Sequence, residues 1–138
     1  MGSELPRRAS RRKRVELFWV GVGGFAGANA RYVMGRAVDS RFGTAFPYGT
    51  LAINIAGSLL IGILVTLLAE RYAPSHAVRL LLVTGVLGGY TTFSTYAFEA
   101  IALADRGQFG RSLLYILASN GLALAACVAG IALVRALR

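Results

Sequence analysis

The sequence predicts an all-α integral membrane protein with four transmembrane helices and a break in the third. Of its 138 residues, 56% are hydrophobic and only six are acidic. Four stretches are long and apolar enough to cross a bilayer, which takes about 20 residues: residues 17–36, 46–69, 78–103 and 112–134, behind a basic tail at 1–16. Because the loops between them are short, we expect one membrane domain at 17–138 and no soluble catalytic domain.

The third stretch contains the pattern that predicts the break. Gly88-Gly89 is followed closely by Thr91-Thr92, and glycine and β-branched threonine both weaken a helix. Backbone groups freed at bilayer depth are tolerated only where they are buried in protein or line a polar cavity or ion site. Freed carbonyls suit a small cation such as sodium. We therefore expect the functional site here.

The basic tail accounts for much of the formal charge of +9. Six of the 15 basic residues lie within it, which favours contact with anionic lipid and an effect on orientation. Since no basic residues are interleaved with aromatics, no nucleic-acid partner is expected. The tail, the apolar stretch and Ala28-Asn29-Ala30 also resemble a cleavable signal peptide. The stretch continues past Ala30, however, and three more follow it, so we expect it to be retained.

Polar side chains in the first two stretches allow two interpretations each. Arg31 either reaches the membrane interface or faces a water-filled vestibule that attracts anions. In the second stretch Thr50 and Asn54 share one helical face with Gly57 and Ser58. Asn54 either joins two helices by a hydrogen bond or offers its amide donors to a passing anion.

The last two stretches add hydroxyl groups and aromatic rings. Tyr115 and Ser119 follow Ser112 on one face of the fourth stretch and form a candidate polar track. Phe93 and Tyr96 project from one side of the helix beyond the break, and ring edges, unlike ring faces, attract anions. No catalytic triad, paired carboxylates or metal-ligand spacing occurs in the sequence, so we expect no enzyme. Together these neutral donors and ring edges indicate an anion.

Three motifs resemble those of the Fluc (CrcB) family of small fluoride channels. They are GANARY at 27–32, GTLAIN at 49–54 with Gly57-Ser58, and GGYTTFSTY at 88–96. The resemblance implies a dual-topology, antiparallel dimer with two fluoride pathways at its interface and a structural sodium ion near its centre. It also implies a multi-pass protein of the cell membrane that exports fluoride passively and lowers cytoplasmic fluoride.

The resemblance also implies residue roles. Main-chain carbonyls of Gly88 and Thr91 would ligate sodium from each subunit, and the fluoride pathway would include Arg31, Thr50, Asn54, Phe93, Tyr96, Tyr115 and Ser119. This sequence departs from the family pattern at two positions. Tyr96 stands where phenylalanine is usual, so the ring gains a hydroxyl group, and Ala123 stands where the polar track often continues with one.

The distribution of basic residues on the two sides of the membrane indicates whether the partner in the dimer is a second copy or a homologue. With four spans, ten basic residues lie on the tail side and five on the other, and without the tail the counts are four and five. A balanced core permits insertion in both orientations, whereas the tail favours one. We therefore expect a homodimer or a pair with an oppositely oriented homologue. Two other functions stay open from the sequence: a small multidrug-type exporter and a structural subunit of a membrane assembly.

Overall fold

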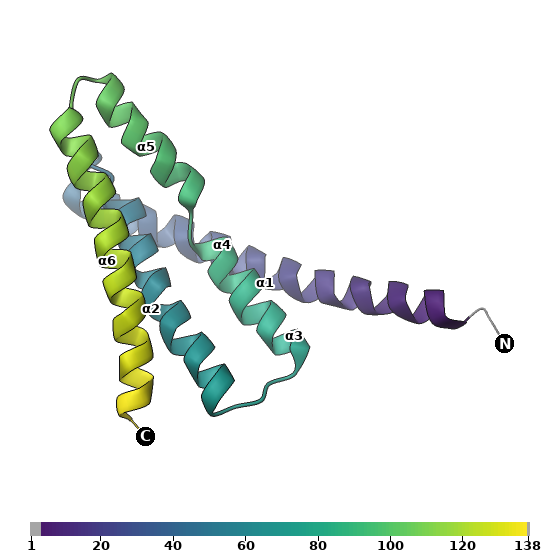
Figure 1. Ribbon diagram of the computed structural model, residues 1–138. Helices are drawn as coiled ribbons and strands as arrows, with labels where there is room; N and C mark the ends of the chain where they lie inside the picture. Colours follow the sequence, from purple (N-terminus) through teal and green to yellow (C-terminus); the bar gives the residue numbers. More distant parts are fainter. Residues whose placement is uncertain (1–3, 138) are drawn as a thin grey trace.

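The computed structural model describes the backbone of residues 4–137 and the side chains of residues 12–137. No strand occurs in this range, and Figure 1 shows a chain made of helices and short connections. The elements are α1 (Glu4–Phe42), α2 (Tyr48–Glu70), α3 (His76–Arg79), the π-helical segment η1 (Leu80–Leu87), α4 (Gly88–Tyr90), α5 (Phe93–Asp105) and α6 (Phe109–Ala136). The all-helical prediction is confirmed.

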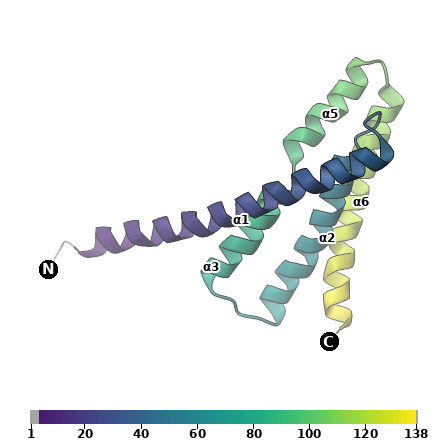
Figure 2. The ribbon, with the colours of Figure 1, turned by 180° about the vertical axis from the view of Figure 1, so that it is seen from behind.

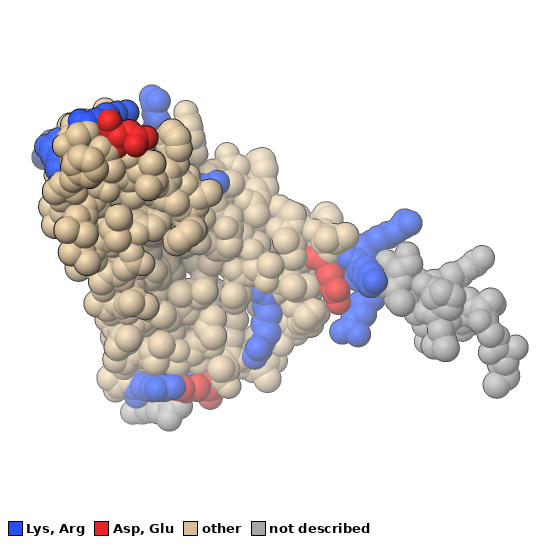
Figure 3. All heavy atoms as spheres, turned by 45° about the horizontal axis from the view of Figure 1, so that its top comes forward, with Lys and Arg blue, Asp and Glu red and all other residues tan. Residues whose placement is uncertain are grey.

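Three helical segments of the described chain are long and apolar enough to cross a membrane: Tyr48–Glu70, His76–Asp105 and Phe109–Ala136. The first predicted span lies within α1, which runs for 39 residues and begins inside the basic tail. Arg31 and several glycines lower the hydropathy of that stretch, so its role as a fourth span stays a prediction. In Figure 3 the charged side chains gather mainly toward the ends of the molecule, and the surface between them is mostly uncharged.

The helices pack in two groups: α1 with the first half of the third span, and α2 and α5 with α6. Helix α1 crosses η1 and α4 and also contacts α2, while α2 lies along α6 and α5 packs on the first part of α6. Figures 1 and 2 show this arrangement from opposite sides, and in both the N-terminal part of α1 extends beyond the other helices. Successive spans alternate in direction, so the linkers at 43–47 and 106–108 lie at the same end.

Glycines allow α1 to approach the third span closely. A Cβ atom added at Gly23, Gly27 or Gly89 would clash with backbone atoms of the facing helix. Gly23 and Gly27, four residues apart on one face of α1, therefore let the two backbones come close together. Gly62 and Gly130 play the same part between α2 and α6, where an added Cβ would meet a backbone carbonyl of the other helix.

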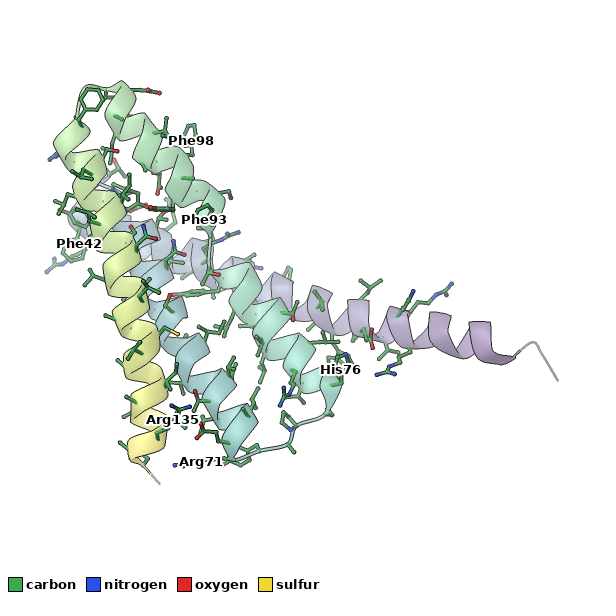
Figure 4. All side chains as sticks on the ribbon, in the orientation of Figure 1. Phe42, Arg71, His76, Phe93, Phe98 and Arg135 are labelled. Carbon is green, nitrogen blue, oxygen red and sulfur yellow. The ribbon has the colours of Figure 1, made fainter. Side chains whose placement is uncertain are left out.

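The helix ends are fixed by local motifs and by contacts between helices. Gly107, at φ +75°, ends α5 in a Schellman motif: Gln108 N donates to Leu103 O at 3.0 Å, and Gly107 N donates to Ala104 O at 2.8 Å. At the opposite end Arg135 pairs with Glu70 at 3.0 Å. Figure 4 shows Arg135 close to Arg71 at this end. These contacts hold α2 and α6 in register.

Candidate functional site at the break in the third span

The third span is interrupted where the sequence predicts it. Helix α4 ends at Tyr90, Thr91 and Thr92 are extended, and α5 begins at Phe93. Thr92 caps the new helix, since its Oγ1 accepts from Thr95 N at 3.3 Å and also donates to Thr95 Oγ1 at 2.9 Å. The break therefore has a stable geometry of its own, built from threonines.

Asn54 on α2 holds this break from the side. Its Nδ2 donates to Thr92 O at 2.9 Å, and its Oδ1 accepts from Thr92 N at 2.9 Å. The carboxamide thus pairs with both backbone groups of one residue, as a neighbouring strand would. One of the two Nδ2 protons serves Thr92 O, and the second stays available to another acceptor. Asn54 is therefore a clamp for the break and also a donor group beside it.

The same hydrogen bonds release two backbone carbonyls. In an unbroken helix Thr92 N would donate to Gly88 O, and Thr95 N would donate to Thr91 O. Here Thr92 N donates to Asn54 and Thr95 N donates to the Thr92 side chain. Arg31 Nη1 lies 3.4 Å from Thr91 O, at the long end of the hydrogen-bond range. The two carbonyls named for sodium are thus among those that lose their helical partners at the break.

An open groove of about 460 Å³ runs beside the break. Its polar lining includes the side chains of Asn54, Thr92, Ser119 and Asn120, and the rings of Phe93 and Tyr96 also line it, together with apolar residues of α2, η1 and α6. The groove therefore combines a few hydrogen-bonding groups with largely apolar walls.

Two of these groups differ sharply in exposure. Phe93 is 76% exposed, and Figure 4 shows it at the start of α5, beside the break. Ser119, by contrast, is only 7% exposed, and its hydroxyl group is buried next to the hydroxyl group of Tyr115. A hydroxyl group can donate one hydrogen bond and accept two, so it can also serve a bound ion or water.

Aromatic rings continue from the groove into the core. The ring centroids of Phe93 and Tyr96 lie 5.4 Å apart, those of Tyr96 and Tyr115 also 5.4 Å, and those of Tyr115 and Phe46 5.5 Å. Tyr115 is fully buried and does not line the groove. Its ring instead supports Tyr96 from behind.

A carboxylate lies behind this aromatic row. Glu99 accepts hydrogen bonds from Thr50 Oγ1 at 3.0 Å and from Tyr115 OH at 2.8 Å. Thr50 and Glu99 line a second, smaller pocket of about 250 Å³ near the end of the molecule, together with Asp39 and Arg106. This cluster joins α2, α5 and α6 through one acidic side chain.

The structure groups most of the predicted site residues but not all. Asn54, Phe93, Tyr96 and Ser119 line the groove, as do Gly88 and Thr91. Thr50 and Tyr115 lie at the Glu99 cluster, and Arg31 lies behind the break at the Thr91 carbonyl. Sequence reasoning gave no role to Glu99 or Asn120. The sequence could have indicated a role for Glu99, because it is the only acidic residue within the third predicted span, and charged residues inside a membrane span are usually functional.

Comparison with known proteins is consistent with this geometry. The family described as "CrcB-like protein, Camphor Resistance (CrcB)" matches residues 18–131, which include every element of the groove. The chain belongs to the CrcB family. Its membership, together with three helices able to span a bilayer, makes it a multi-pass membrane protein.

Several relatives carry the name "Fluoride-specific ion channel FluC". One from Agrobacterium fabrum is 49% identical over 121 residues, which cover 88% of this chain and 97% of the relative. One from Rhizobium meliloti is 48% identical over 118 residues, covering 86% and 94%. A third, from Rhizobium etli, is 45% identical over 123 residues, covering 89% and 98%. The similarity to this CrcB chain thus extends across nearly the whole length of each relative.

Proposed function

We propose that this protein is a fluoride-selective ion channel that releases fluoride from the cytoplasm passively, down its electrochemical gradient. The observation that carries the proposal is the groove at the break, where amide and hydroxyl groups and aromatic rings surround an open path. The names of the relatives supply the identity of the anion. The protein acts as a channel and catalyses no reaction.

Each part of the groove replaces part of the water shell of the ion. Asn54 offers the Nδ2 proton that the Thr92 carbonyl does not use, and Ser119 offers a buried hydroxyl group at the wall of the groove. Phe93 offers the positive edge of its ring. Fluoride is small and holds water tightly, so donors that contact the ion together would favour it.

The freed carbonyls at the break form the sodium site of the proposal. Gly88 O and Thr91 O lack their helical partners because Asn54 and Thr92 take the N–H groups, and unwound carbonyls are the usual sodium ligands in membrane proteins. The ion would supply fixed positive charge at the break.

The sodium site and the groove both favour a second chain. One chain contributes only two of the carbonyls named for sodium, and an antiparallel copy would double them. Phe93 is 76% exposed beside the groove, so a second copy packed there would close the path and bury the ring. In this dimer α1 also crosses the membrane, so each subunit has four spans, and the two copies insert in opposite orientations.

The orientation is tested by labelling a cysteine placed in the 71–75 linker of a Cys127→Ala background, in sealed vesicles. A dual-topology homodimer predicts labelling from both faces of the membrane. Labelling from one face alone would require an oppositely oriented homologue as the partner.

The function is tested by growth of a bacterial strain that lacks fluoride export. Cells that produce this protein are expected to grow at fluoride concentrations that stop cells carrying an empty vector. Tolerance of chloride and of toxic organic cations serves as the control, because an exporter of cationic drugs would alter the latter. Equal fluoride sensitivity of the two strains, with the protein present in the membrane, contradicts the proposal.

A further inference from the structure

The side chain of Asn120 on α6 is fixed by two hydrogen bonds. Its Nδ2 donates to Ile116 O at 2.8 Å and to Tyr96 OH at 2.8 Å. The Ile116 carbonyl can only accept, so the nitrogen of the carboxamide must face it. Both Nδ2 protons are therefore used, and the Tyr96 hydroxyl is the acceptor of one of them.

This arrangement leaves the hydroxyl proton of Tyr96 unused. A phenol group can accept and donate at once, and within residues 12–137 no hydrogen bond takes the Tyr96 proton. Tyr96, Asn120 and the neighbouring Ser119 all line the groove. The ring itself is held between Phe93 and Tyr115, with centroids 5.4 Å away on each side. The proton is thus attached to a positioned side chain at the edge of the proposed path.

We infer that the Tyr96 hydroxyl is a further anion ligand in the groove and that Asn120 is the residue that positions it. This inference rests on the proposed function and deepens it. The chain has a tyrosine at a place where a ring edge alone would serve, and Asn120 gives the added hydroxyl a defined direction. An accepted hydrogen bond also polarises the hydroxyl, which makes it a better donor to fluoride.

The test compares four proteins in liposomes: wild type, Tyr96→Phe, Asn120→Leu and the double variant. The measured quantities are the fluoride concentration that half-saturates efflux and the maximal rate. Loss of one hydrogen bond to the charged ion is expected to raise the half-saturating concentration about ten- to 150-fold in Tyr96→Phe. Tyr72→Phe is the matched control, because Tyr72 lies in the 71–75 linker and is exposed.

Asn120 has a separate expected signature. Asn120→Leu should raise the half-saturating concentration in the wild-type background and have no effect in the Tyr96→Phe background, because it acts only through the hydroxyl. A purely structural role of Asn120 would give the same change in both backgrounds and overturns the positioning role. If Asn120→Leu fails to give a monodisperse protein, Tyr96→Phe alone decides the ligand role.

The outcomes separate this inference from the proposed function. Wild-type fluoride efflux with an unchanged half-saturating concentration in Tyr96→Phe overturns the ligand role and leaves the channel in place. Absence of fluoride efflux from wild-type protein refutes the proposed function itself.

Discussion

Replacing Asn54 by aspartate changes one atom type at the centre of the proposed path. The Oδ1 atom can still accept from Thr92 N, but the group that replaces Nδ2 is an oxygen that faces Thr92 O. The hydrogen bond of 2.9 Å between Nδ2 and that carbonyl is lost. Two acceptor oxygens then oppose each other at the break.

The size of the effect follows from two terms. Loss of the hydrogen bond, with an unsatisfied carbonyl left behind, costs about 1–3 kcal/mol in the stability of the break. A new carboxylate also repels a passing anion, by about 4 kcal/mol at a separation of about 4 Å and an effective dielectric constant of about 20. The second term alone corresponds to a decrease in fluoride flux of about a thousandfold. The charge is therefore expected to dominate.

The assay is fluoride efflux from liposomes that contain Asn54→Asp, Asn54→Leu or wild-type protein at equal protein content. Asn54→Leu removes both hydrogen bonds without adding a charge, so it isolates the contribution of the clamp. We expect the leucine variant to be slower than wild type and the aspartate variant to be slower still. Wild-type flux through a folded Asn54→Asp protein would refute the place of Asn54 on the path.

Three further predictions concern other parts of the molecule. Gly27→Ala should lower the unfolding temperature in detergent, with a loss of about 1–3 kcal/mol from overpacking. Gly21→Ala, where an added Cβ meets nothing, should raise it slightly, because alanine favours a helix by about 0.5–1 kcal/mol over glycine; equal temperatures for the two variants would contradict the glycine contact. Glu99→Leu should also lower the unfolding temperature, because the hydroxyl groups of Thr50 and Tyr115 lose their acceptor, which costs about 1–3 kcal/mol for each lost hydrogen bond. A stability equal to wild type would show that the Glu99 cluster does not stabilise the fold. Arg31→Gln should lower the sodium concentration that supports half-maximal fluoride efflux, since a cation that competes for Thr91 O is removed; an increase would show that Arg31 supports the sodium site.

The sequence predicted the interruption of the third span because its causes are local. Gly88-Gly89 weakens the helix, and Thr92 caps the next one through its own side chain and Thr95. The glycine contact at Gly27 was likewise predictable, because spacing alone indicates which small residues share a face.

The partners across the structure could not be read from spacing. Asn54 pairs with Thr92 across 38 positions, and Glu99 meets Thr50 across 49. Helical periodicity shows which residues share a face but does not show which faces meet. For the same reason the shared face of Tyr115 and Ser119 predicted a polar track but did not show that the Tyr115 hydroxyl donates to Glu99.

The central claim, that the groove at the break conducts fluoride, is tested most directly by parallel fluoride and chloride electrodes. Liposomes that hold the purified wild-type protein and equal amounts of both salts are diluted into salt-free medium with an ionophore that balances charge. The account predicts rapid release of fluoride while chloride is retained. Release of both ions at similar rates, or of neither from folded protein, would contradict it.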